Sequence, residues 1–171
     1  MDFKGTLIDE IMMLPRFWWL WLCAAAAVCF GICVLWSTAS DKKPDKGRIV
    51  FKSLFAAYVL FILFVTILNR SAGESAAELV PFWSYHIPEL RAEIILNYIL
   101  FIPFGFLLAM CTDRHLWTVA AAGFILSASV ETAQLVFGIG LFEFDDMIGN
   151  TAGTVFGLLA AGVVKHRTEI K

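Results

Sequence analysis

Hydrophobic residues are concentrated in long runs along the chain, and polar residues lie mostly in the shorter stretches between them. An α-helix needs about 20 apolar residues to cross the hydrocarbon core of a bilayer. The runs that reach or approach that length are Phe17–Trp36, Ile49–Asn69, Ile94–Thr112, Leu116–Phe137 and Met147–Val164. The pattern therefore predicts an all-α fold, a polytopic transmembrane helical bundle of about five helices.

The N-terminal part of the chain is expected to keep its membrane helix. Its apolar run is longer than the hydrophobic region of a signal peptide, and Asp2, Asp9 and Glu10 lie where such a peptide is basic. Apolar residues at helical spacing before Pro15 predict a short helix in the membrane interface, with a disordered tail as the alternative. The predicted division is an N-terminal part with a basic cytoplasmic loop, 1–48, a core of four membrane helices, 49–165, and a basic cytoplasmic tail, 166–171.

Composition supports a membrane protein. The chain is 60% hydrophobic and 16% charged, whereas a soluble domain has about 25% charged residues. No cluster of Lys and Arg suggests a nucleic-acid interface, so we expect no nucleic-acid partner. The four Cys have no C-x-x-C spacing and are interpreted as small apolar residues, without a disulfide or zinc site.

The Lys and Arg residues between the runs predict the orientation, because cytoplasmic loops are enriched in them. One side of the membrane would hold Lys4, Arg16, Arg70 and Arg91, and the other Lys42, Lys43, Lys46, Arg48, Lys52, Arg114, Lys165, Arg167 and Lys171. The second side is predicted to be cytoplasmic, with the C-terminus, which puts the N-terminus outside.

Polar residues from three of the predicted helices would then lie at one depth, in the outer half of the bundle. They are Asn97, Glu131, Gln134, Asp145, Asp146 and Asn150. A charged residue at the bilayer centre costs about 2.5–3.5 kcal/mol on insertion scales, so a buried acid is expected to face a partner or a cavity. Glu131 is the strongest functional candidate. The structural alternative is a hydrogen-bonding stripe with Ser127 and Gln134 on one helix face.

The other polar and small residues near this cluster have simpler interpretations. Asp145 and Asp146 are suited to capping a helix N-terminus, and Glu143 is expected to be solvated. The repeat of Gly149, Gly153 and Gly157 predicts close helix packing, and a homo-oligomer through this face is the alternative. In the third run, Pro103 predicts a kink, and Gly105 is interpreted as loosening the same turn.

The loop at 70–93 is predicted to be an interfacial or re-entrant segment at the outer face. Trp83 and Tyr85 suit the head-group region, and its two Pro residues interrupt any long helix. His86 and Arg91 are candidate basic residues near the acids, although an interfacial histidine without chemistry is the alternative for His86.

Four segments, in order along the chain, resemble the VanZ family. They are Glu78–Phe82, Leu96–Leu108, Ser127–Gln134 and Phe142–Gly157, the last with the Asp-Asp and Asn-Thr-x-Gly signature. This chain has Gly140 where members often have a basic residue. If that residue binds phosphate in the family, either Arg91 or Arg70 substitutes for it here or the ligand differs. The resemblance implies a multi-pass protein of a bacterial cell membrane, associated with glycopeptide (teicoplanin) resistance.

Together, the cluster and the resemblance favour a protein that acts on or binds phosphate-linked lipid head groups or lipid-linked cell-envelope precursors at the outer leaflet. The predicted catalytic residues are Glu131, as general base, with Asp145 and Asp146. These three would also hold a divalent cation, Mg²⁺ or Mn²⁺, if one is used. The predicted substrate-binding residues are Asn97, Gln134, Asn150, His86 and Arg91. Catalysis stays open, because a non-catalytic binding or shielding protein and a small lipid transporter fit the same residues.

Overall fold

The computed structural model describes residues 46–68, 70, 76–83, 88–112 and 115–169. Its elements are α3 (Lys46–Leu63), a π-helical turn η1 (Phe64–Leu68), β1 (Ala77–Glu78), α4 (Pro88–Cys111), α5 (Leu116–Phe137), β2 (Phe142–Glu143) and α6 (Phe144–Glu169). The run Phe17–Trp36 and the expected interfacial helix lie outside the described residues.

The described helices confirm the helical membrane fold. Those long and apolar enough to cross a membrane contain the spans Gly47–Leu68, Ile94–Cys111, Leu116–Phe137 and Phe144–His166. They correspond to the last four apolar runs of the sequence. Helix α4 begins at Pro88, before its apolar run, and α6 ends at Glu169, after its run.

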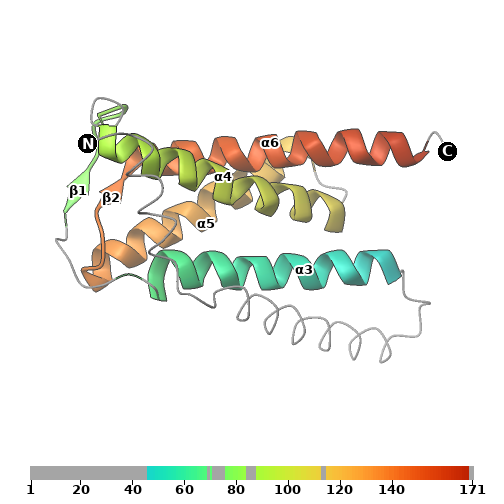
Figure 1. Ribbon diagram of the computed structural model, residues 1–171, viewed down its shortest axis with the longest axis horizontal. Helices are drawn as coiled ribbons and strands as arrows, with labels where there is room; N and C mark the ends of the chain where they lie inside the picture. The colour runs from blue at the N-terminus through green and yellow to red at the C-terminus, as the bar shows by residue number, and fades with distance from the viewer. Residues whose placement is uncertain (1–45, 69, 71–75, 84–87, 113–114, 170–171) are drawn as a thin grey trace.

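The four helices alternate in direction. Helices α3 and α5 run one way and α4 and α6 the other, so η1 and α5 end where α4 and α6 begin (Figure 1). We call this the polar end of the bundle, because Glu131, Gln134, Glu143, Asp145 and Asp146 lie near it. At the opposite end, α3 begins and α6 ends, with Lys165 and His166 near the end of α6.

Glycines bring α6 against α4. A Cβ atom on Gly153 would overlap the carbonyl oxygen of Tyr98, and one on Gly157 would overlap that of Ile102. From the other side, a Cβ on Gly105 would overlap the carbonyl oxygen of Thr154. Gly105 therefore allows close packing of two backbones, which is a different role from the loosened turn expected at Pro103. Gly153 and Gly157 therefore pack against α4 within the chain, and a homo-oligomer through the face with Gly149, Gly153 and Gly157 stays a prediction.

Helix α3 joins the bundle through aromatic residues. Ile62, Phe101 and Phe104 are buried together, and the rings of Phe55 and Phe104 have centroids 5.3 Å apart. The Tyr58 hydroxyl donates a hydrogen bond of 2.8 Å to the Leu100 carbonyl, which ties α3 to α4. These contacts lie in the apolar part of the bundle, away from the polar end.

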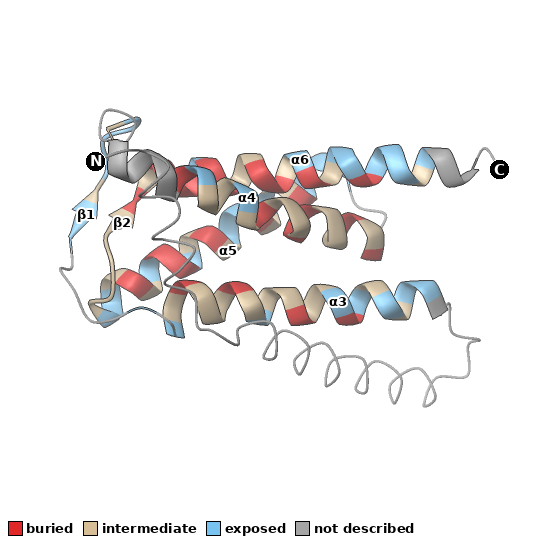
Figure 2. Cartoon of the chain, viewed as in Figure 1, coloured by how far each residue is buried: buried red, intermediate tan, exposed pale blue. Residues whose placement is uncertain are grey.

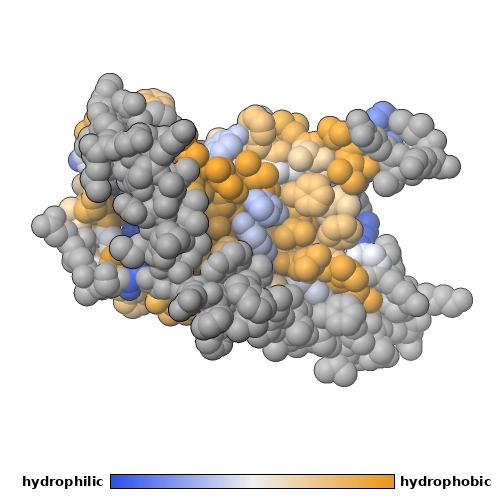
Figure 3. Space-filling view, in the orientation of Figure 1, coloured by the Kyte–Doolittle hydropathy of each residue, from blue (hydrophilic) through white to orange (hydrophobic). Residues whose placement is uncertain are grey.

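Apolar side chains also cover the outside of the bundle. Figure 2 shows buried residues on the facing sides of the helices and exposed ones on their outer sides. The exposed large apolar residues include Leu60, Ile99, Ile125, Phe156, Leu159 and Val163. On the face in Figure 3, the described residues over the middle of the bundle are mostly apolar. A helix that is apolar on all sides suits a lipid environment.

Candidate functional site

Most of the buried polar side chains gather at the polar end. Ser127, Glu131 and Gln134 come from α5, Glu143 from β2, and Asp145, Asp146 and Asn150 from α6, and all are buried. Hydrogen bonds link this set to Asn97 on α4 and to η1. The structure thus brings together Asn97, Glu131, Gln134, Asp145, Asp146 and Asn150, as the sequence predicted. Glu143 is only 4% exposed, so the expectation of a solvated side chain was wrong.

Glu131 is positioned by the hairpin between α5 and α6. Helix α5 ends at Gly138, whose left-handed φ of 64° closes the helix as a C-cap. The chain then returns through β2, and the Glu143 backbone N–H donates to Glu131 Oε2 at 3.0 Å. Glu131 is 2% exposed. One carboxylate oxygen therefore fixes the start of α6, while the acid itself stays at the centre of the site.

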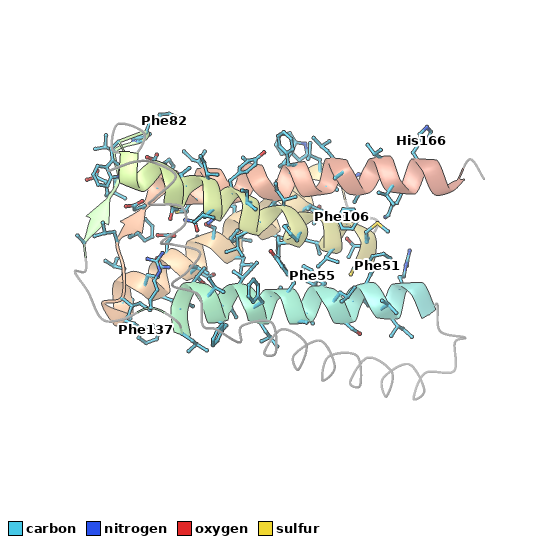
Figure 4. All side chains as sticks on the ribbon, in the orientation of Figure 1. Phe51, Phe55, Phe82, Phe106, Phe137 and His166 are labelled. Atoms are coloured by element: carbon cyan, nitrogen blue, oxygen red, sulfur yellow. The ribbon has the colours of Figure 1, made fainter. Side chains whose placement is uncertain are left out.

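The two aspartates at the start of α6 connect it to different segments. Asp145 Oδ1 accepts a 2.6 Å hydrogen bond from the Phe82 backbone N–H. Asp146 Oδ2 accepts one of 2.6 Å from Asn97 Nδ2 on α4. Figure 4 shows Phe82 at this end of the bundle and His166 at the other. Asp145 thus holds the loop over the site, and Asp146 faces the interior of the bundle.

The loop itself is attached by a short parallel pairing. Ala77 pairs with Phe142 and Glu78 with Glu143, so β1 lies beside β2. Phe82 follows in a turn with a φ of 66°, an uncommon conformation for a bulky residue. Its side chain and those of Leu79 and Val80 are exposed. Entry of this loop into the bilayer stays a prediction, whereas its contact with the start of α6 is a feature of the fold.

Amide side chains complete the connections inside the site. Gln134 Nε2 donates to the carbonyl of Thr66 at 3.0 Å. The Thr66 carbonyl lies in η1, the last turn before the chain leaves the helix, where main-chain oxygens have no helical partner. Asn150 Nδ2 donates to Ser127 Oγ at 2.8 Å and joins α6 to α5. Both amides therefore have structural roles, and sequence reasoning identified neither the Thr66 carbonyl nor the Ser127 hydroxyl as their partner.

Three buried polar atoms at this end have no hydrogen-bond partner among the described residues. They are Asp146 Oδ1, Asn150 Oδ1 and Trp83 Nε1. Asp146 is 7% exposed and Asn150 3%. A buried acceptor without a donor costs about 1–3 kcal/mol. The site therefore has two acceptor oxygens and one indole N–H that a bound molecule can satisfy.

Arg70 brings positive charge to the same end. A Cβ on Gly140 would lie 2.9 Å from Arg70 Nη1 and 3.3 Å from Gln134 Oε1, so the guanidinium occupies the space that this glycine leaves free. Arg70 also interacts electrostatically with Glu131 and Asp146. The sequence prediction named Arg91 as a binding residue, with Arg70 as the other candidate for the missing basic residue. The contact with Gly140 favours Arg70 as the residue that replaces the missing basic side chain. The Arg91 side chain and the whole of His86 lie outside the described residues.

Comparison with known proteins places this arrangement in a family. The family model described as VanZ/LLP1 matches residues 50–165, more than half of the chain. The chain belongs to the VanZ/LLP1 family. It is also 28% identical to Protein VanZ of Enterococcus faecium over 138 residues, which cover 73% of this chain and 82% of that relative. No solved structure matches the chain. The VanZ/LLP1 match includes every side chain of the site described above, from Thr66 to Asn150.

A metal in this VanZ/LLP1 site stays a prediction. Among the described residues, no group of three or more His, Cys, Asp or Glu side chains is arranged to hold a metal ion. The predicted ligands Asp145, Asp146 and Glu131 instead accept hydrogen bonds from Phe82, Asn97 and Glu143.

Proposed function

We propose that this VanZ/LLP1-family protein binds the phosphate-linked head group of a membrane lipid, or of a lipid-linked cell-envelope precursor, at the polar end of its bundle. The observation that carries the proposal is the pair of buried oxygens, Asp146 Oδ1 and Asn150 Oδ1, which lack a partner in the described part of the chain. A ligand that donates to them would remove the cost of leaving them unpaired.

Arg70 supplies the complementary half of the site. Arginine donates several N–H bonds to phosphate oxygens in a fixed planar geometry. In a chain whose outer surface is apolar, a lipid is the ligand class whose phosphate reaches the end of a membrane helix. The Lys and Arg distribution predicts that the polar end lies in the outer leaflet. Binding there to lipid-linked precursors is the route by which the protein would contribute to glycopeptide resistance.

Glu131 is the residue best suited to chemistry on the bound head group. Its Oε2 is held by a backbone N–H, which fixes the carboxylate next to Asp146. A fixed carboxylate can accept a proton from an attacking hydroxyl group as a general base. Asp146, hydrogen-bonded to Asn97, would orient the head group, and Asp145 would hold the loop in place.

Arg70→Ala tests the proposed binding. We expect the affinity for dioctanoyl phosphatidylglycerol to fall by about tenfold or more, because a hydrogen bond to a charged group contributes about 1.5–3 kcal/mol. The measurement is a titration of the purified chain in detergent, followed by native mass spectrometry. The matched control is Arg48→Ala, at the start of α3 and therefore at the opposite end of the bundle. This variant should leave the affinity unchanged.

Gly140→Ala provides a second variant of the same site. Its Cβ meets the end of a flexible side chain, so the protein should fold with Arg70 displaced and bind the lipid more weakly. Gly138→Ala is the comparison, because it strains a left-handed position but meets nothing within 4 Å. Equal affinity of the wild type, Arg70→Ala and Gly140→Ala would reject phosphate recognition by Arg70.

A further inference from the structure

We propose that the polar end selects head groups that carry a hydrogen-bond donor, an ammonium or hydroxyl group, beside the phosphate. The inference rests on the proposed function and narrows its ligand class. Phosphate recognition alone would not require buried acceptors. The atoms that carry the inference are Asp146 Oδ1 and Asn150 Oδ1, which accept no hydrogen bond within the described residues.

Asp146 presents one oxygen to the bundle and keeps the other for a ligand. Oδ2 accepts the 2.6 Å hydrogen bond from Asn97 Nδ2, so α4 holds the carboxylate in one orientation. Oδ1 is buried, and in the ionised acid it carries part of the negative charge of the carboxylate. An N–H or O–H donor is the natural partner of such an oxygen, and a donor with positive charge is the strongest.

Asn150 repeats this arrangement one turn further along α6. Its Nδ2 donates to Ser127 Oγ at 2.8 Å, which directs the amide oxygen away from that contact. Because Asp146 and Asn150 are four residues apart, their side chains lie on one helix face with Cβ atoms about 5–6 Å apart. Two acceptors at this spacing suit a group with several donors, such as a primary ammonium or neighbouring hydroxyls.

The donors at the same end match the other half of such a head group. The Arg70 guanidinium lies over Gly140, and the buried Trp83 Nε1 also has no partner among the described residues. Trp83 directly follows Phe82, whose backbone N–H is bound by Asp145 at the start of α6. Donors for phosphate oxygens and acceptors for an ammonium or hydroxyl group therefore lie together.

Choline is the informative contrast. Its trimethylammonium group has the same charge as an ethanolamine ammonium but no N–H, so it would leave both oxygens unpaired. Attraction by charge alone would hold the two head groups equally. Recognition by hydrogen bonds should favour ethanolamine or glycerol head groups over choline by about tenfold or more.

The test compares dioctanoyl phosphatidylethanolamine, phosphatidylglycerol and phosphatidylcholine as ligands of the purified full-length chain, with affinities from native mass spectrometry. Tighter binding of the ethanolamine lipid alone identifies an ammonium site, and tighter binding of the glycerol lipid alone a hydroxyl site. Equal affinities for all three overturn this inference and leave the proposed function standing. Failure of all three lipids to bind overturns both.

Variants locate the selectivity. Asp146→Asn and Asn150→Ala should bring the ratio of ethanolamine or glycerol to choline affinity close to one, even where overall affinity falls. Thr151→Ala is the matched control, because its hydroxyl donates a local hydrogen bond to the Met147 carbonyl. If the affinity ratio stays at its wild-type value in both Asp146→Asn and Asn150→Ala, these two acceptors are not the source of the head-group selectivity. The three-lipid comparison of the wild type tests the inference even if a variant fails to fold.

Discussion

Alanine at Gly157 is expected to prevent α6 from packing on α4. The added Cβ would overlap the carbonyl oxygen of Ile102 and lie 2.6 Å from the Phe106 backbone nitrogen. Both atoms belong to the main chain of α4, so no side-chain rotation relieves the contact. Overpacking of this kind costs about 1–3 kcal/mol and more where the backbone must move. We expect a large drop in melting temperature in detergent, or loss of the folded protein.

Gly162→Ala is the matched control for this prediction. The residue lies in the same helix, and a Cβ there would meet nothing within 4 Å. Alanine is better than glycine inside a helix by about 0.5–1 kcal/mol, so this variant should be as stable as the wild type or slightly more stable. Equal stability of Gly157→Ala and Gly162→Ala would contradict the packing of α4 on α6.

Glu131→Gln is expected to have the largest effect on function. Glutamine keeps the size of the side chain, and its oxygen can still accept from the Glu143 backbone N–H, so the hairpin should form. The negative charge and the proton acceptor are lost. If the bound head group is transferred or cleaved, the rate should fall by about 10²–10⁴-fold, the usual contribution of a general base. In cells, any teicoplanin tolerance that the chain confers should disappear.

Two measurements check this prediction. Teicoplanin tolerance is compared at equal protein amounts for the wild type, Glu131→Gln and the control Thr132→Val. The Thr132 hydroxyl is exposed on the same helix and donates to the Ala128 carbonyl. Lipid affinity is then measured for each. Unchanged affinity with lost tolerance assigns Glu131 to chemistry. Full tolerance of Glu131→Gln would limit Glu131 to holding the α5–α6 hairpin.

The sequence was sufficient to predict the described membrane helices and the gathering of polar residues. Membrane helices need long apolar runs, and alternating directions then place Asn97, Glu131 and Asp146 at one end. The first and last residues of the helices could be predicted less precisely. Helix α4 begins at Pro88, six residues before its apolar run, because hydropathy marks only the segment of a helix that can lie within the hydrocarbon core.

The long-range contacts of the site could not be predicted from local patterns. Strands β1 and β2 have two residues each, too few to show an alternating pattern, and their pairing joins residues far apart in the chain. Their pairing and the hairpin contact to Glu131 bury Glu143, which the sequence alone suggested was solvated. The sequence offered Arg70 only as an alternative to Arg91, because the position of its guanidinium over Gly140 is a contact that no spacing rule reveals.

The central claim, that a lipid head group binds at the polar end, is tested most directly by photo-cross-linking. The probe is a phospholipid with an unmodified head group and a diazirine on a methylene carbon in the part of the acyl chain near the glycerol, and peptide mass spectrometry maps the labelled residues. We predict labels at 79–83, 138–141 and the first turn of α6 that excess unlabelled lipid suppresses and that Arg70→Ala removes. Suppressible labelling confined to the opposite end, around Leu116 and Lys165, would contradict the claim.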